Sequence, residues 1–137
     1  MKIFFCACLL GNHESFPGNL FTSHNVPPKM WTSSWLYKYM ASTNVWRRWL
    51  PTTDFKLLDD IEKLASYSVL AHPGFRIISF NMNYCYSLNF WNYLNMTDPD
   101  ESLKWLINEL QTAENNKELV HLLGHIPSGD SCTEVRK

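Results

Sequence analysis

Residues 3–14, IFFCACLLGNHE, join a short apolar run to a polar turn, and this junction decides the fold. A run of this length is typical of a buried strand that delivers the turn to the end of a sheet. The run also follows Lys2, which gives residues 1–10 the shape of a minimal signal peptide, although no convincing cleavage site follows. We favour the strand, and we divide the chain into this apolar start, 1–10, and one domain, 11–137.

A similar junction recurs late in the chain. Residues 119–123, LVHLL, indicate a second buried strand, and the polar turn Gly124-His125-Ile126-Pro127 follows it. Between the two junctions the sequence predicts two helices, a strand pair about a tight turn and a third helix, at residues 34–50, 54–64, 67–70, 75–81 and from 98 onward. This order predicts an α/β fold, and such sheets place their chemistry at strand ends.

Two of the predicted helices have distinctive sequences. The clearest start is Asp98-Pro99-Asp100-Glu101, which offers an Asp cap, Pro at the first helical position and Glu three residues after the cap. The helix over 34–50, with Ser34 as its expected cap and Pro51 as its stop, is the most aromatic stretch; its large rings and intervening cations are Trp35, Lys38, Tyr39, Trp46, Arg47, Arg48 and Trp49. It is either a core helix with solvated charges, which we favour, or an interfacial surface that contacts lipid.

Length and composition restrict the possible functions. The chain has 137 residues, of which 45% are hydrophobic, so it can form one modest domain. Its net charge of -1 provides no basic surplus for phosphate backbones, which disfavours a nucleic-acid partner. No apolar run approaches the roughly 20 residues that span a bilayer, so we expect no transmembrane segment. Residues 15–33, rich in Ser, Pro, Gly and Asn, predict a long loop.

Cysteine spacing leaves several roles open. The chain has four cysteines, which allow three pairings, and sequence alone does not choose among disulfides, free thiols and metal ligands. Cys6-Ala7-Cys8 is not a zinc knuckle, because no second close Cys or His pair follows at ligand spacing. Asn95-Met96-Thr97 is the one acceptor pattern for N-glycosylation, and such a short pattern often arises by chance.

The two junctions carry a family resemblance. Gly11-Asn12-His13-Glu14 looks like the GNHE/GNHD motif of calcineurin-like metallophosphoesterases, and residues 124–129, GHIPSG, resemble the GHIPPG segment of the acid sphingomyelinase branch, with Ser128 in place of the second proline. Further segments match in the family's order; they are SWLY at 34–37, ISFNMNYC at 78–85, NFW at 89–91 and NMTDP at 95–99. The resemblance implies part of a two-sheet sandwich flanked by helices, with residues 11–137 as a partial catalytic domain.

The resemblance also implies a reaction and its residues. Asn12, through its amide oxygen, and His125 would bind one of two zinc ions, which share a hydroxide that attacks phosphorus in line. His13 would stand beside the scissile phosphate, stabilise the transition state and help to protonate the leaving alkoxide. For sphingomyelin, a phospholipid, the products are ceramide and phosphocholine. The family's pattern would join Cys85 to Cys132, which implies a secreted or lysosomal protein and favours a glycan on Asn95.

The chain departs from the family in its metal ligands. Members carry Asp-x-His and Gly-Asp segments before GNHE and a Gly-His-x-His segment after the GHIPPG region, and this sequence has none of them at those places. Gly129-Asp130 does not substitute, because it lies downstream within the His125 loop. His121 is not expected to share an ion with His125, since four residues of strand span roughly 13 Å. The remaining polar candidates are expected to be solvated, locally bonded or capping residues; they are His24, Asp59, Asp60, His72, Asp98 and Asp100.

These departures leave three hypotheses. The chain is part of a zinc-dependent sphingomyelin phosphodiesterase, a truncated product that does not catalyse, or an inactive paralogue. Nucleotide phosphodiesters are an alternative substrate class, because the branch that prefers them shares much of the metal machinery. Removing the outer strands of the family's sandwich would expose sheet edges and apolar faces, so we expect poor solubility of the isolated chain.

Overall fold

The sheet begins with the hairpin that the sequence predicts. In the computed structural model, which describes residues 7–27, 31–42, 44–51, 54–94, 97–129 and 132, strands β1 (Tyr67–His72) and β2 (Phe75–Ser79) pair antiparallel. The turn between them contains Gly74, whose φ of 77° is a left-handed conformation that glycine adopts without strain. The prediction of two strands about a tight turn is therefore confirmed.

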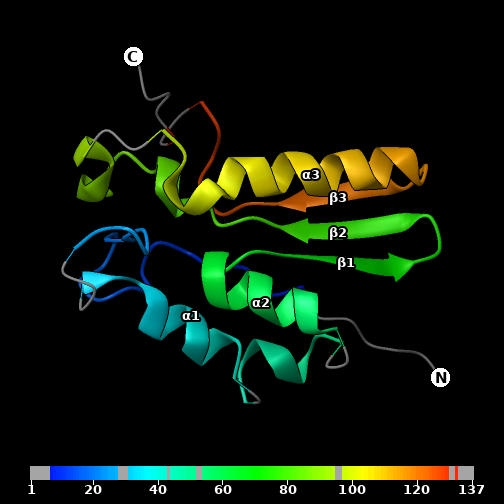
Figure 1. Ribbon diagram of the computed structural model, residues 1–137, viewed down its shortest axis with the longest axis horizontal. Helices are drawn as coiled ribbons and strands as arrows, with labels where there is room; N and C mark the ends of the chain where they lie inside the picture. The colour runs from blue at the N-terminus through cyan, green and yellow to red at the C-terminus, as the bar shows by residue number, and fades with distance from the viewer. Residues whose placement is uncertain are drawn as a thin grey trace.

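A parallel strand completes the sheet of the described residues. β3 (Leu119–Leu123) pairs with β2 in parallel, which gives the order β1-β2-β3 (Figure 1). The connection between β2 and β3 contains the short helices η3 (Met82–Cys85), η4 (Phe90–Leu94) and η5 (Pro99–Glu101) and the long helix α3 (Ser102–Asn115). Because Ser79 pairs with Leu123, the segments that follow β2 and β3 leave the sheet at the same end. The α/β prediction is confirmed.

The first predicted helix divides in two. α1 (Ser34–Met40) ends near Ala41, and the shorter helix η2 (Trp46–Arg48) follows. Ser42 lies at the break: its N–H donates to the carbonyl of Tyr39, and its own carbonyl accepts from the N–H of Val45. Serine and asparagine compete with helical hydrogen bonding and favour turns, so the prediction of one helix over 34–50 is wrong.

The two acidic helix starts differ in geometry. The predicted helix over 54–64 is confirmed as α2 (Phe55–Leu64), and Asp54 caps it because its side chain accepts from the N–H of Leu57. Asp98 also accepts from helical N–H groups, those of Leu103 and Lys104, but α3 begins at Ser102, four residues later. The predicted capping box at Asp98 is therefore wrong in register, since the intervening Pro99–Glu101 forms η5.

The main core lies on one side of the molecule. α1 packs on α2, α2 packs on β1, and α3 lies beside β3 on the other side (Figure 1). The core is built from side chains of the segments up to β1, together with one residue of η3; its members are Leu10, Phe21, Leu36, Tyr37, Met40, Ala41, Trp46, Leu50, Leu57, Ile61, Ala65, Tyr67, Val69 and Tyr84. Burial of these groups is the main stabilising term of the fold.

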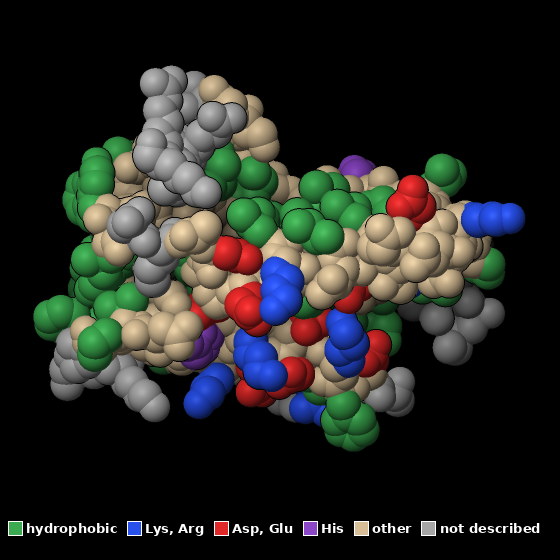
Figure 2. Space-filling view, turned by 45° about the horizontal axis from the view of Figure 1, so that its top comes forward, with side chains coloured by type: hydrophobic (Ala, Val, Ile, Leu, Met, Phe, Trp, Pro, Cys, Tyr) green, Lys and Arg blue, Asp and Glu red, His purple; other side chains and the backbone are tan. Residues whose placement is uncertain are grey.

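The side formed by α3 and β3 is much more open. Leu119 and Leu122 of β3 are 74% and 48% exposed, so the prediction of a fully buried strand is wrong. Leu103, Ile107 and Leu110 of α3 are exposed as well, and Figure 2 shows hydrophobic side chains in a row over α3. Contiguous apolar surface favours association, and the poor solubility of the isolated chain stays a prediction.

A charged network adjoins this row (Figure 2). Arg76 of β2 donates to Glu118 from Nε at 2.6 Å and from Nη2 at 3.3 Å. Lys56 of α2 donates to Glu109 of α3 and to Asp60. Burial raises the pKa of Asp60, although the hydrogen bond from Lys56 opposes this effect. Asp60 is thus buried and paired, which corrects the expectation of a solvated side chain.

The apolar start reaches the sheet without joining it. Residues 7–10 form no strand, so the predicted strand is wrong there, while residues 1–6, with Cys6, lie outside the described residues. Residues 7–10 are held to the sheet by side-chain hydrogen bonds and not by strand pairing. The carbonyl of Cys8 accepts from the hydroxyls of Tyr67 and Ser79, at 2.8 and 2.9 Å. Leu10 is buried in the core, which brings the next residues to the end of the sheet.

Candidate metal and phosphate site

The turn at residues 11–14 is held by hydrogen bonds from two later segments. The backbone N–H of Asn19 donates to the carbonyl of Asn12 at 2.8 Å, and the side-chain amide of Asn12 donates to Oδ1 of Asn19 at 2.6 Å. The carbonyl of Gly11 accepts from Nδ2 of Asn83 in η3 at 3.3 Å. The turn is therefore fixed both by its own loop and by the segment that follows β2.

His125 meets this turn across 113 residues of sequence. Its Nε2 lies 3.0 Å from Oδ1 of Asn12, a hydrogen bond when Nε2 carries the proton. His125 follows β3, while Leu10 anchors the Asn12 turn in the core. The structure thus brings together the two residues that the resemblance assigned to one metal ion.

Gly11 allows this close approach. A Cβ atom at position 11 would lie 2.7 Å from Oε2 of Glu14 and 3.3 Å from Nε2 of His125. Carbon and oxygen do not approach to 2.7 Å without displacement, so any side chain here would push Glu14 or His125 away. Glu14 and His125 are exposed and can give way, so Gly11 favours the close approach of the two segments without being required for it.

The pair of Asn12 and His125 fits two positions of a zinc shell. Ligands held about 2.0–2.1 Å from a tetrahedral ion lie about 3.3 Å from each other, which is close to the 3.0 Å between Oδ1 and Nε2. Imidazole nitrogen is a common zinc ligand, and an amide oxygen supplies a neutral oxygen donor. Among the described residues, no group of three or more His, Cys, Asp and Glu side chains could hold a metal ion. The described residues therefore offer two donors, Asn12 and His125, that could belong to a metal site.

The other histidines near the sheet are placed differently. His13 is exposed beside Asn12, so solvent and ligands can reach its ring. His121 is exposed on β3 at the position that pairs with Ile77, and His72 is exposed at the end of β1. Among the described residues, no hydrogen bond joins His121 or His72 to Asn12 or His125.

Comparisons with known proteins identify the family to which this chain belongs. The profile described as Calcineurin-like phosphoesterase matches residues 2–136. The chain belongs to the calcineurin-like phosphoesterase family. It is 43% identical over 123 residues to Sphingomyelin phosphodiesterase 2 of Caenorhabditis elegans, covering 89% of this chain and 19% of the relative. It is 43% identical over 120 residues to human Sphingomyelin phosphodiesterase, covering 88% of this chain and 18% of that relative.

A third relative carries a different name. The human Cyclic GMP-AMP phosphodiesterase is 34% identical over 122 residues, covering 88% of this chain and 24% of the relative. The chain spans about a fifth of the length of the sphingomyelin phosphodiesterases that it matches. It is thus similar to part of the acid sphingomyelinase branch of the calcineurin-like phosphoesterases, a family of metal-dependent hydrolases.

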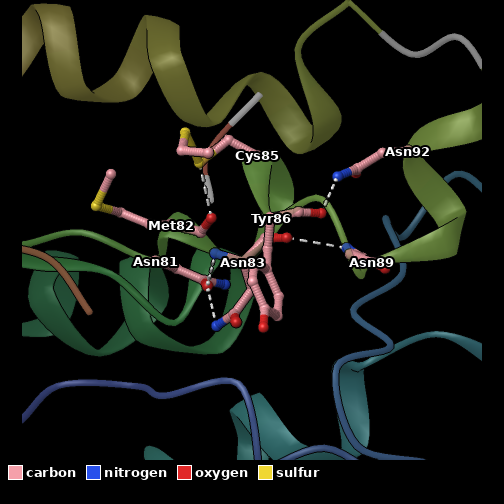
Figure 3. The surroundings of a disulfide bond; sticks show 8 residues. Asn81, Met82, Asn83, Cys85, Tyr86, Asn89 and Asn92 are labelled. Carbon is pink, nitrogen blue, oxygen red and sulfur yellow. Dashed lines mark hydrogen bonds between the residues drawn. A yellow bond between two sulfur atoms is a disulfide. The ribbon is translucent and has the colours of Figure 1, made fainter. Parts of the chain in front are cut away.

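The disulfide implied for this family is present. Cys85 at the end of η3 is bonded to Cys132 (Figure 3). The N–H of Cys132 also donates to the carbonyl of Pro127, two residues beyond His125. The disulfide therefore ties the loop that carries His125 to η3. Asn83 of η3 in turn donates to the carbonyl of Gly11. Asn95, the predicted glycosylation site, lies outside the described residues.

Buried asparagines support the site from behind, and the sequence reasoning assigned them no role. Oδ1 of Asn81 accepts from both the backbone and the side chain of Asn83 (Figure 3). Asn89 binds both backbone groups of Phe21 and donates to the carbonyl of Asn83. All three side chains are at most 1% exposed. The sequence does indicate them in one way: they are asparagines within an apolar, aromatic stretch, and an asparagine that is buried there needs hydrogen-bond partners.

A second cluster corrects the expectation for His24 and Asp100. Asp100 accepts from the hydroxyls of Ser23 and Tyr84, at 2.6 and 2.9 Å, and its Oδ2 lies 3.1 Å from Nδ1 of His24. The Asp100 side chain is only 7% exposed. Burial alone would raise the pKa of Asp100, but the hydrogen bonds from His24, Ser23 and Tyr84 outweigh it and lower that pKa. We call these four residues the Asp100 cluster.

A large cavity adjoins the His125 loop. Its volume is about 970 Å³, and apolar side chains of α3 and β3 line it together with Gly124 and Ile126. Asn12, His13 and His125 are not among its lining residues. The candidate site of this phosphoesterase is therefore on an exposed edge and not inside the cavity.

Proposed function

We propose that this chain carries part of the active site of a zinc-dependent sphingomyelin phosphodiesterase, with Asn12 and His125 as ligands of one zinc ion. The observation that carries the proposal is the 3.0 Å distance between Oδ1 of Asn12 and Nε2 of His125. Two segments 113 residues apart place an oxygen and a nitrogen donor side by side, each as the second residue of a family motif. His125 is exposed and Asn12 is half-buried, and neither side chain belongs to the hydrophobic core.

The chain's own residues would share the work of phosphodiester cleavage. Bound zinc would supply positive charge for the phosphoryl oxygens and a water of lowered pKa. Asn12 and His125 would orient that ion. His13, exposed next to Asn12, would give its proton to the leaving oxygen as the bond from phosphorus to that oxygen breaks. In sphingomyelin the leaving oxygen belongs to ceramide, and the other product is phosphocholine.

The choice of sphingomyelin over a nucleotide rests on similarity. Identity is 43% to two sphingomyelin phosphodiesterases and 34% to the cyclic GMP-AMP phosphodiesterase. Sphingomyelin is presented in a membrane or micelle, so we also propose peripheral contact with a lipid surface. The exposed rings of Trp35, Tyr39 and Trp49, with Lys38 and Arg48 nearby, support this contact. Among the described residues, no helix combines the length and apolar character needed to cross a bilayer.

A secreted or lysosomal location completes the proposal. The Cys85–Cys132 disulfide supports it, because such bonds persist in oxidising compartments. A glycan on Asn95 would be expected in the same compartments, and mass spectrometry of the secreted protein would detect it.

A Zn²⁺ titration of the chain by calorimetry tests the metal site. We expect Asn12→Ala and His125→Ala to weaken binding at least tenfold. His121→Ala is the matched control, because His121 is also exposed and lies on the strand that leads to His125. Equal affinities in all four proteins would overturn the proposal.

Product analysis tests the reaction. Phosphocholine released from sphingomyelin by the wild-type chain with Zn²⁺, and not by His13→Ala, would establish the activity and the role of His13. Zinc binding without any release would favour the truncated or inactive alternative. Cleavage of a cyclic dinucleotide in preference to sphingomyelin would replace the proposed substrate.

A further inference from the structure

The side-chain amide of Asn12 can face His125 in two ways, and only one of them presents oxygen. An asparagine amide has an oxygen acceptor at one tip and an NH₂ donor at the other. A metal ion accepts electron pairs only from the oxygen, so binding requires the NH₂ group to point elsewhere. A partner that accepts a hydrogen bond from this NH₂ group would favour the productive orientation.

Asn19 is placed to be that partner. Its Oδ1 accepts from Nδ2 of Asn12 at 2.6 Å, while Oδ1 of Asn12 faces Nε2 of His125 at 3.0 Å. The backbone N–H of Asn19 also donates to the carbonyl of Asn12 at 2.8 Å, so backbone and side chain of the two residues are both joined. The amide of Asn12 is therefore held at its nitrogen end and presented at its oxygen end.

We infer that Asn19 is a positioning residue, which orients the amide of Asn12 so that its oxygen is available to a metal ion shared with His125. This inference rests on the proposed function. Asn19 does not contact His125 and would act only through Asn12. Partners of this kind typically contribute about 10- to 100-fold to the metal affinity of a site.

The backbone of Asn19 permits selective variants. Its φ of 69° is in the left-handed region, which Gly, Asn and Asp adopt more readily than other residues. Asn19→Gly keeps the backbone conformation and the N–H donor but removes the side-chain acceptor. Asn19→Asp keeps the acceptor and cannot donate, so it holds the NH₂ group of Asn12 in the same place.

Asn19→Asp adds a negative charge, which alone attracts cations. Gly18→Asp is the matched control for this effect. A Cβ atom at Gly18 would meet no atom within 4 Å, so a carboxylate there sits one residue away without disturbing the turn. The acceptor effect of Asn19→Asp is the difference between it and Gly18→Asp.

The experiment is a titration of each full chain with Zn²⁺ alone, together with urea unfolding of the metal-free proteins. We expect Asn19→Gly to bind Zn²⁺ about 10- to 100-fold more weakly than the wild type. We expect Asn19→Asp to bind at least as tightly as Gly18→Asp and the wild type. Unfolding midpoints should change little, since the affected groups are partly exposed. Binding by Asn19→Gly within about threefold of the wild type would overturn the inference, because the expected loss is at least tenfold.

A second readout separates this inference from the proposed function. In the metal-free wild-type chain, the Nδ2 protons of Asn12 should exchange with water more slowly than in Asn19→Gly, as measured by NMR. A wild-type chain that does not bind Zn²⁺ would overturn the proposed function, and equal proton exchange in the two proteins would overturn the role of Asn19 independently of metal.

Discussion

Two histidine–oxygen pairs join distant segments of this molecule, and their surroundings differ sharply. His125 meets Asn12 at an exposed edge, across 113 residues of sequence. His24 meets Asp100 across 76 residues, but there the oxygens also accept from Ser23 and Tyr84, and the acid is buried. One pair has room for a further ligand, whereas the other is enclosed by its own partners.

The difference separates a site from a structural cluster. Buried polar groups that are fully hydrogen-bonded rigidify a fold, and losing one partner is costly. The Asp100 cluster fits this description, because it joins the loop before α1 to the start of α3. The Asn12 and His125 pair lies at the edge of the molecule with His125 exposed, and this accessibility is what the proposed role as metal ligands requires.

Removal of Asp100 should have the largest effect. Asp100→Ala leaves Ser23, Tyr84 and the N–H of His24 without their acceptor, so we expect a loss of about 2–3 kcal/mol in the free energy of unfolding. Asn12→Ala should change it by no more than about 0.5 kcal/mol. Urea denaturation measures both.

A matched control uses another acid. Asp59 is exposed on α2 and paired with Lys63 four residues away, so Asp59→Ala should cost less than about 0.5 kcal/mol. A loss from Asp59→Ala equal to that from Asp100→Ala would show that the Asp100 cluster has no special structural role.

Zinc should affect the other pair. At a free concentration about ten times the dissociation constant, Zn²⁺ should stabilise the wild-type chain by about 1.4 kcal/mol. Asp100→Ala should gain the same increment, because its metal ligands are intact, while His125→Ala should gain much less. Thermal or urea unfolding with and without Zn²⁺ provides the measurement. A loss of this increment in Asp100→Ala would show that the two regions are coupled.

Much of the fold could be predicted from local patterns. The cap at Asp54, the hairpin at Gly74 and the order of strands and helices follow from turn chemistry and periodicity. The break after Met40 and the late start of α3 at Ser102 were missed, because both depend on hydrogen bonds outside the helical pattern. The exposure of β3 was missed because an apolar run looks the same whether or not a neighbour covers it.

The candidate site was predicted in part. The motifs pointed to Asn12 and His125, and the structure places them together. Asn19 and Asn83 were missed, since each matters through a contact between loops that spacing does not reveal. Asp100 was expected to be a solvated or capping residue. Its partners Ser23 and His24 come from the long loop far upstream, which local patterns do not reveal.

Acid should weaken the Asp100 cluster to a smaller extent. The folded chain lowers the pKa of Asp100 below its ordinary value of 3.8, so the ionised acid contributes stability above about pH 4. That contribution is lost as the pH falls through this value toward the lower pKa of the folded chain. The loss should be smaller than that from Asp100→Ala, because a protonated acid still makes hydrogen bonds.

Asp100→Asn isolates this contribution from those of the other acids. Urea denaturation between pH 6 and pH 3 should show a steeper loss for the wild type than for Asp100→Asn. Parallel curves for the two proteins would mean that Asp100 does not account for any of the acid sensitivity.

The smallest change in stability is expected from a methyl group at the turn. Gly11→Ala would place Cβ 2.7 Å from Oε2 of Glu14 and 3.3 Å from Nε2 of His125. Glu14 and His125 are both exposed and can move, so the free energy of unfolding should fall by less than about 1 kcal/mol. The distance from His125 to Asn12 should increase, however, and NMR shifts of the His125 ring should report it.

Gly18→Ala is the control, because its Cβ meets no atom within 4 Å. If Gly11→Ala leaves the His125 ring and zinc affinity unchanged, the exposed pair tolerates displacement, and the close approach at Gly11 does not define the site.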